Sequence, residues 1–231
     1  NTIDPNFIIN PSIRDENGYT LDFGFRGSWR DIVSYDVSSF YLFYNNRIGF
    51  IQREFNDGSV KNEKGNIGDA RILGQEFSFN FNLVKILKLP SKFRFNYFIN
   101  NSLINSEYIF SKENGVQGND VEFVPKINLK TGLEFGFLNF RTSLQYTFLS
   151  NQFTDATNSI QSDLGGIIGE IPQYEILDFS YAYMLNNMQI EFGINNVLNR
   201  HYFTTRATGY PGPGIIPSPT RNIYFTFEYK F

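Results

Sequence analysis

The sequence predicts an all-β fold, an antiparallel up-and-down transmembrane β-barrel to whose wall this chain contributes about nine strands. Large apolar residues alternate with polar ones along many short segments, and the connections between the segments are alternately short and long. The chain also ends inside such a segment, on Phe231. Aromatic residues make up 18% of the chain although its mean hydropathy is only -0.29, so its apolar residues are dispersed among polar ones.

Alternation with a period of two marks each predicted strand. From the N-terminus, the strands are expected at residues 19–25, 32–55, 77–83, 93–99, 127–135, 140–148, 177–184, 188–195 and 223–231. The segment 32–55 is the longest and the least regular. In the others one row of side chains is apolar, and we expect the opposite row to face a polar lumen. The polar members of that row include Lys130, Glu134, Arg141, Gln145, Asp178, Glu191 and Glu228.

The final strand shows the pattern most clearly. Its apolar row is Ile223, Phe225, Phe227, Tyr229 and Phe231, and the residues between them form the polar-tolerant row. Soluble proteins rarely end on a large aromatic side chain within a strand, whereas bacterial outer-membrane barrels commonly do. The resemblance to such barrels suggests that Phe227, Tyr229 and Phe231 serve as an assembly signal.

The connections predict two different rims. Short joins fall near residues 30–31, 84–91, 138–139 and 186–187, and long ones near 56–69, 108–122, 151–173 and 199–219. The long connections contain the Gly, Pro, Asn and Asp residues that favour turns and irregular loops. Successive connections of an up-and-down barrel lie on opposite rims. We therefore expect a tight periplasmic rim, which includes the C-terminus, and an extracellular rim with long loops.

Composition excludes several other classes of protein. No stretch has the ~20 consecutive apolar residues that a membrane-spanning helix needs. The chain has 0 cysteines, which removes disulfides and thiolate metal sites. A net charge of -3 and a pI near 5.3 provide no basic field, so nucleic acid is not an expected partner.

A soluble β-sandwich or lipocalin-like barrel would show the same alternation. The terminal Phe231, the asymmetry of the connections and the aromatic residues near predicted strand ends favour the membrane barrel. These aromatic residues are Tyr19, Tyr41, Phe43, Phe137, Phe148 and Tyr229.

The odd strand number predicts a partial wall. Bacterial single-chain barrels have even strand numbers, and an open sheet would expose two unpaired edges to lipid. Residues 1–11 also lack the basic start and apolar core of a signal peptide. We expect residues 1–13 to be the remnant of an extracellular loop and residues 14–231 to be strands and loops of a longer barrel.

The segment from Ile194 to Phe231 has a family resemblance. Its Asn-rich stretch INNVLNRHY and its aromatic last strand resemble the end of TonB-dependent outer-membrane receptors. The run from Tyr202 to Pro217 resembles the ferric-citrate type, and residues 10–13 followed by 19–24 resemble the family's entry from a loop into a strand. The resemblance implies the C-terminal part of a 22-stranded, plugged barrel, with the N-terminal plug absent from this sequence.

The resemblance also implies a function: TonB-dependent uptake of a ferric chelate, such as ferric citrate or another siderophore, with no enzymatic activity and no cofactor. The implied location is the outer membrane of a Gram-negative bacterium, with multiple membrane passes. The implied partners are outer-membrane lipids, the chelate, the barrel assembly machinery, and the TonB complex of the inner membrane acting through the plug. A passive porin-like channel would have a similar polar lumen and stays an alternative.

An anionic chelate needs fixed cations and hydrogen-bond donors, because guanidinium groups can hold carboxylates with two hydrogen bonds. The candidates for ligand contact are Arg200, His201, Tyr202, Arg206, Tyr210 and Arg221. Each has a simpler interpretation. The arginines could instead meet lipopolysaccharide, neighbouring acids or water, and Tyr202 could only anchor its loop.

His201 is the chain's 1 histidine, and an outer-membrane hydrolase would combine it with residues such as Ser218 and Asp155. No motif brings these three together, so no catalytic site is predicted. A single histidine without cysteine cannot form a His/Cys metal site. The acids Asp57, Glu63 and Asp69 are too dispersed for a calcium site, so no metal site is predicted either.

Overall fold

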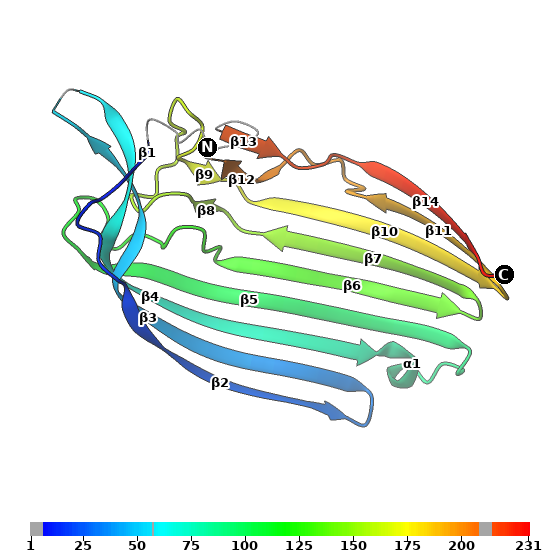
Figure 1. Ribbon diagram of the computed structural model, residues 1–231. Helices are drawn as coiled ribbons and strands as arrows, with labels where there is room; N and C mark the ends of the chain where they lie inside the picture. Colours follow the sequence, from blue (N-terminus) through cyan, green and yellow to red (C-terminus); the bar gives the residue numbers. More distant parts are fainter. Residues whose placement is uncertain (1–6, 57, 208–213) are drawn as a thin grey trace.

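The computed structural model describes residues 7–56, 58–207 and 214–231, and within them one large sheet dominates the fold (Figure 1). Its nine antiparallel strands lie in the order β14-β11-β10-β7-β6-β5-β4-β3-β2, and a short strand, β1, pairs in parallel with β4. The nine strands are β2 (Asn17–Trp29), β3 (Val33–Glu54), β4 (Val60–Asn82), β5 (Phe93–Ser111), β6 (Ile127–Phe137), β7 (Phe140–Leu149), β10 (Tyr174–Leu185), β11 (Met188–Asn195) and β14 (Asn222–Tyr229). The prediction of nine up-and-down strands is confirmed.

Smaller elements complete the described part of the chain. They are β1 (Phe7–Ile9), the helix α1 (Leu83–Ile86), and the two small hairpin pairs β8 (Gln152–Phe153) with β9 (Glu170–Ile171) and β12 (Phe203–Ala207) with β13 (Gly214–Pro217). No helix in the described residues is long and apolar enough to cross a membrane.

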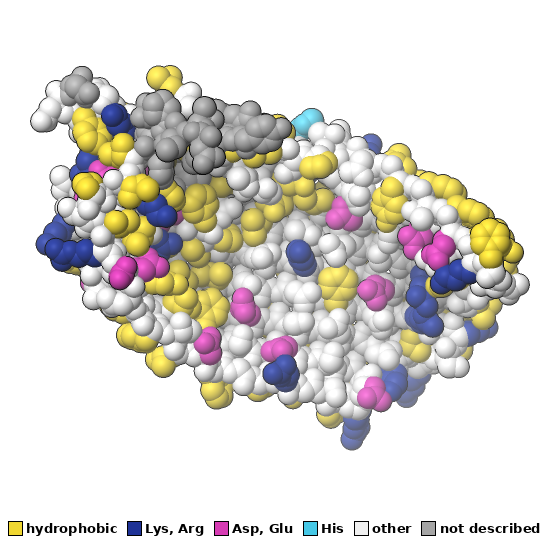
Figure 2. Space-filling model, in the orientation of Figure 1, with side chains coloured by type: hydrophobic (Ala, Val, Ile, Leu, Met, Phe, Trp, Pro, Cys, Tyr) yellow, Lys and Arg dark blue, Asp and Glu magenta, His cyan; other side chains and the backbone are white. Residues whose placement is uncertain are grey.

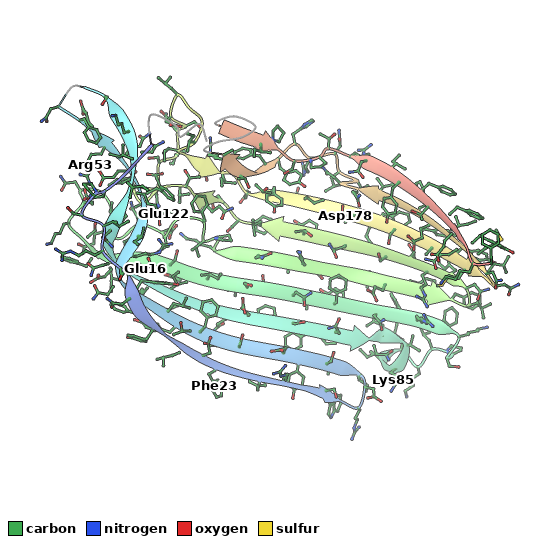
Figure 3. All side chains as sticks on the ribbon, in the orientation of Figure 1. Glu16, Phe23, Arg53, Lys85, Glu122 and Asp178 are labelled. Carbon is green, nitrogen blue, oxygen red and sulfur yellow. The ribbon has the colours of Figure 1, made fainter. Side chains whose placement is uncertain are left out.

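The sheet is a curved, open wall rather than a closed barrel, because β2 and β14 are both edge strands. Figure 2 looks into its concave side, where charged side chains lie scattered over the surface. The register explains this distribution. Pairs such as Leu133 with Leu144 lie on one face, and pairs such as Gln145 with Asp178 lie on the other. Phe23 belongs to the apolar face and points away from the concave side in Figure 3.

The predicted polar row is confirmed by the same register. Glu134 lies opposite Ser143, Arg141 opposite Ala182, and Glu191 opposite Thr226, all on one face. Lys130, Gln145, Asp178 and Glu228 pair on that face too. On this face the ring of Tyr224 packs against the backbone at Gly193 of the neighbouring strand. A Cβ at position 193 would lie 2.3 Å from that ring, so the close packing requires glycine.

The two ends of the wall differ, and we name them by their connections. The turn rim contains the short connections at residues 30–32, 83–92, 138–139 and 186–187, together with the C-terminus. The loop rim contains the described parts of the long connections and the segment 7–13. The segment 84–91, expected as a plain short join, includes part of α1.

At the loop rim the prediction of a long loop at residues 56–69 is wrong. β3 and β4 instead continue as a paired hairpin up to Glu54 and Val60, closed by a hydrogen bond from the Phe55 amide to the Ser59 carbonyl oxygen at 2.8 Å. β5 similarly continues to Ser111, into the expected loop 108–122. Beyond a membrane, a strand needs no apolar row facing lipid, so the alternation that predicted the wall is lost there while backbone pairing continues.

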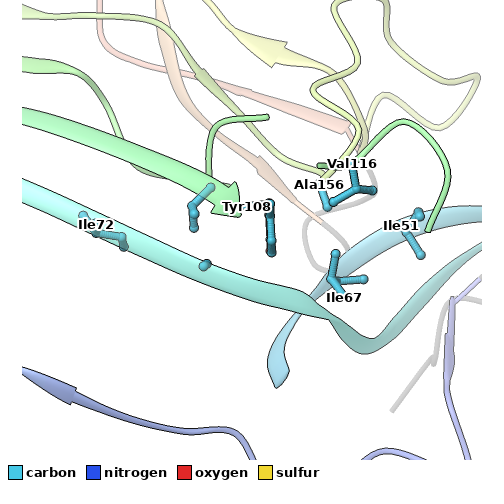
Figure 4. Close-up of a cluster of buried hydrophobic side chains, with 8 residues drawn as sticks. Ile51, Ile67, Ile72, Tyr108, Val116 and Ala156 are labelled. Carbon is cyan, nitrogen blue, oxygen red and sulfur yellow. The ribbon is translucent and has the colours of Figure 1, made fainter. Parts of the chain in front are cut away.

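This hairpin and the loops beside it form a second structural region, which we call the projection: the described residues of 46–69, together with 112–126 and 150–171. The projection and the adjacent strand segments have a core of buried side chains (Figure 4). The core consists of Ile51, Ile67, Ala70, Ile72, Tyr108, Val116, Val121 and Ala156. β1 also joins this region, because Ile8 pairs with Glu63 of β4. Residues 7–13, expected as a loop remnant, thus begin with a strand.

Candidate functional site

The candidate site is the polar concave face together with the loop rim above it. Near the turn rim, a hollow in the concave face is lined by Arg94, Glu134, Arg141, Glu191 and Tyr224. None of the four charged residues takes part in an ion pair among the described residues. Glu191 accepts a hydrogen bond from the Gln189 side-chain amide, and the charges that lack a charged partner can interact with water, a ligand or another protein segment inside the barrel.

The predicted ligand residue Arg200 contacts an acidic neighbour. Its guanidinium forms an ion pair with Glu175, and the second oxygen of Glu175 accepts a hydrogen bond from the Tyr146 hydroxyl at 2.9 Å. Glu175 lies opposite Phe148, which itself lies opposite Leu129 in the apolar row. The Arg200 guanidinium therefore reaches the convex face of the wall, and its ligand contact stays a prediction.

The residues next to Arg200 have different environments. His201 is exposed. The ring of Tyr202 packs on that of Tyr174, with ring centroids 4.7 Å apart, and the Tyr202 carbonyl oxygen accepts from the Ser218 amide at 3.0 Å. These contacts anchor the loop, as the simpler interpretation of Tyr202 expected. Tyr210 lies outside the described residues.

Arg206 connects two loops of the rim. Its guanidinium donates to the carbonyl oxygens of Gly166 and Glu170, each at 2.8 Å, and lies over the Phe203 ring with the Cζ atom 5.1 Å from the ring centroid. Burial lowers the pKa of this guanidinium from its ordinary value. Arg221, in contrast, is exposed, and its backbone amide donates to Asn199 Oδ1 at 3.1 Å; among the described residues its guanidinium has no hydrogen-bond or ion-pair partner. Arg221 is thus the predicted arginine whose side chain is most available to a ligand.

The structure provides no support for a hydrolase triad. Asp155 is fully buried and accepts hydrogen bonds from the Thr157 amide and from the Ser159 amide and hydroxyl, each at 3.1 Å. No hydrogen bond in the described part of the chain joins Asp155 to His201 or Ser218. Within the same residues, no group of three or more His, Asp or Glu side chains is placed to hold a metal ion.

A buried polar cluster at the loop rim was not predicted from the sequence. Glu122 accepts hydrogen bonds from the Tyr108 hydroxyl at 2.7 Å and from the Phe50 amide at 3.1 Å, and its Oε2 lies 3.4 Å from Arg47 Nη1. Burial, and then the charge of Glu122, raise the pKa of Tyr108 above its ordinary value. Gly49 is the one local signal, since a Cβ there would lie 2.3 Å from Glu122 Oε1.

A second ionic cluster fastens the tip of the projection. Arg53 donates to Glu63 at 2.8 Å and to Glu113 at 2.9 Å, and Glu63 also accepts from the Asn10 side-chain amide at 2.7 Å. The hydrogen bond to Glu113 makes the largest contribution to raising the pKa of Arg53. Figure 3 shows Arg53 and Glu122 on the projection, away from the wall. Both clusters join loops that are distant in sequence, so they position the rim rather than catalyse.

Comparison with known proteins decides the family of this wall. The family model described as "TonB dependent receptor-like, beta-barrel" matches residues 1–197. The chain belongs to the TonB-dependent receptor-like β-barrel family. This confirms the resemblance expected from the sequence at the level of the family, and the family is one of receptors rather than enzymes.

Solved structures with the same fold include three transporters or receptors of metals. The ferric citrate transporter FecA in its unliganded form is 22% identical, with a TM-score of 0.72 over 92% of this chain and 31% of that chain. The copper transporter OprC is 15% identical, with a TM-score of 0.69 over 96% of this chain and 33% of that one.

The ferric yersiniabactin uptake receptor FyuA from Yersinia pestis is 18% identical, with a TM-score of 0.67 over 94% of this chain and 30% of that chain. At such identities the likeness shows the fold alone. The chain spans about a third of the length of each of these proteins.

Proposed function

We propose that this TonB-dependent receptor-like chain forms part of the wall of an outer-membrane receptor that takes up a ferric chelate, such as ferric citrate or another siderophore, with energy from TonB. The family match over residues 1–197 is the observation that carries the proposal. The chelate would be cargo, and the protein needs no resident cofactor. The proposed location is the outer membrane of a Gram-negative bacterium.

The architecture supports this membrane placement. The convex face bears a mainly apolar row of side chains suited to lipid, and the concave face bears charges suited to water or to a plug. We place the turn rim in the periplasm and the loop rim outside the cell, because barrels of this kind have short periplasmic turns and long extracellular loops. The barrel assembly machinery would insert the wall, and the C-terminal residues Phe227, Tyr229 and Phe231 stay a predicted assembly signal.

The structure supports a ligand-contacting role unequally among the six predicted residues. Arg221 and His201 are exposed at the loop rim, whereas Arg200 and Arg206 already hold Glu175 and two backbone carbonyl groups. Tyr202 packs on Tyr174. We therefore expect Arg221 to contact an anionic chelate directly and Arg206 to act by positioning the loops on which contacts depend.

Uptake of iron-55 ferric citrate by cells that express the complete receptor tests the proposal. We expect uptake to require an intact TonB system and to fall several-fold in Arg221→Ala, with Lys112→Ala as a matched loss of one exposed positive charge on the projection. Uptake of another ferric siderophore but not of citrate would reassign the cargo. Passive solute flux that is unchanged without TonB would contradict the receptor and support the porin-like alternative.

A further inference from the structure

The connection between β4 and β5 is unlike the other connections of the turn rim. Three of them are tight turns centred on positive-φ residues such as Leu138 and Asn186, but this one extends over residues 83–92 and contains α1. Two of its aliphatic side chains face solvent, with exposed fractions of 44% for Ile86 and 56% for Leu87. Apolar side chains exposed at the end of a membrane wall need an apolar environment to cover them.

Basic residues surround these aliphatic side chains. Lys85, Lys88 and Lys92 belong to the same connection, and Lys85 Nζ lies 3.0 Å from Asp31 of the neighbouring turn, beside Arg30. The connection 83–92 and the neighbouring turn at Arg30 and Asp31 therefore contain four basic residues and one acidic residue, in a chain whose net charge is -3. An amphipathic segment with this composition is typical of binding at a membrane interface.

Two of the cations lie on aromatic rings of the convex face. Arg30 Cζ lies 5.1 Å from the centroid of the Trp29 ring, and Lys92 Nζ lies 5.3 Å from that of Phe137 and 5.8 Å from that of Phe93. Register places these rings in the apolar row that faces lipid. Aromatic residues at a strand end mark the depth of the membrane interface. The charges on top of them consequently lie at the level of lipid headgroups.

We propose that the connection 83–92 together with Arg30 binds the headgroups of anionic phospholipids in the periplasmic leaflet of the outer membrane. Ile86 and Leu87 insert at the boundary between headgroups and acyl chains, while Arg30, Lys88 and Lys92 contact phosphate oxygens. Charge complementarity selects the anionic headgroup over a zwitterionic one, because each basic residue near a membrane surface favours anionic lipid. The proposal relies on the membrane orientation proposed above but not on the identity of the cargo.

Electron spin resonance on the complete receptor in phosphatidylcholine vesicles tests this site, with trace nitroxide-labelled phosphatidylglycerol or phosphatidylcholine as the probe. The motionally restricted fraction of each probe gives their relative association with the protein. We expect a preference of roughly fivefold or more for phosphatidylglycerol, weaker in high salt. In the triple variant Arg30→Gln, Lys88→Gln and Lys92→Gln the preference should approach one.

The matched control removes three positive charges at the other end of the molecule, with Lys61→Gln, Lys64→Gln and Lys112→Gln, and should keep the preference. Heat-modifiable migration in gels confirms that each variant is a folded barrel. A triple variant that is folded and as selective as the wild type would overturn the proposal, as expected if these cations instead meet a periplasmic protein segment.

The two proposals can fail separately. Lost headgroup selectivity with normal iron uptake would support the lipid site and leave the receptor function intact. Normal selectivity in a protein that takes up no ferric chelate would overturn the cargo assignment but not the lipid site.

Discussion

The wall and the projection use apolar side chains in opposite ways. In the wall they face outward, as shown by exposed fractions of 75% for Phe23 and 66% for Phe225, whereas in the projection Tyr108 and Val116 are each at 0%. The wall therefore relies on lipid to cover its apolar row, and the projection has a core of its own. The same chemical change should accordingly have different effects in the two regions.

Truncation of Tyr108 should produce the largest effect, because its ring is fully buried in the core and its hydroxyl satisfies Glu122. We expect Tyr108→Ala to lower the free energy of local opening of the projection by about 3–5 kcal/mol. Hydrogen exchange of residues 46–69 and 112–126 in the complete receptor measures this. Phe110→Ala, on the same strand but at a position with 51% exposure, is the control and should change exchange little.

Introducing a charge into the lipid-facing row of the wall should cause the second-largest loss of stability. Phe225→Arg is expected to destabilise the barrel by about 2–4 kcal/mol if the residue lies near the bilayer midplane, because the charge is moved into hydrocarbon. Thr226→Arg, on the concave row, is the matched control. Urea titrations of the receptor in vesicles measure both, and equal losses would contradict the assignment of the two faces.

Overpacking at Gly49 sharpens the comparison within the projection. A Cβ there would meet Glu122 Oε1 at 2.3 Å and the Tyr108 hydroxyl at 2.9 Å, so Gly49→Ala should cost about 1–3 kcal/mol. Gly165→Ala is a suitable control, because its nearest contact would be an ordinary 3.4 Å. Limited proteolysis of the projection compares the two variants. Indistinguishable cleavage rates would contradict the claim that the Glu122 cluster stabilises the projection.

Removal of Arg206 should affect only one side of the rim. Arg206→Ala deletes the hydrogen bonds to Gly166 and Glu170, and we expect a local loss of about 1–2 kcal/mol. Hydrogen exchange over residues 162–171 should rise, while residues 46–69 stay protected. A rise in both regions would mean that the rim opens as one cooperative unit.

The smallest expected effect is a loss of stability of the projection at alkaline pH. The pKa of Tyr108 is raised in the closed projection above its ordinary 10.0, so the closed form keeps the proton that an open form loses. The contribution to stability is complete below pH 10 and declines as the pH rises above it. Opening measured by hydrogen exchange should therefore increase above pH 10 beyond the intrinsic rate. Tyr108→Phe should not show this additional increase.

How far the sequence predicts the structure differs between the same two regions. Alternation locates the wall strands and the two faces, since lipid on one side and water on the other impose a period of two on residues such as those of β14. The projection lacks that constraint. Its hairpin between Glu54 and Val60 depends on backbone pairing, and its core depends on Val116 and Ala156, which come from separate loops.

The candidate site follows the same division. The polar lumen row could be predicted because Glu134 and Glu191 have fixed register positions, whereas the partners of Arg200 and Arg206 depend on loop paths. The Glu122 cluster brings together residues far apart in sequence. Its one local sign in the sequence is the glycine at position 49, where a Cβ would clash with the Glu122 carboxylate. The alternation of polar and apolar residues therefore predicts which side chains share a face of the wall, whereas contacts between loops can be identified only in the structure.

Cysteine accessibility on β14 tests the wall assignment most directly. This chain contains 0 cysteines, so Phe225→Cys and Thr226→Cys can be introduced into a cysteine-free form of the complete receptor in vesicles. We expect Cys at position 225 to react with a lipid-soluble maleimide but not with a charged thiosulfonate, and Cys at position 226 to show the opposite preference. Equal reactivity of both positions toward both reagents would contradict a membrane wall with one face toward lipid and the other toward the lumen.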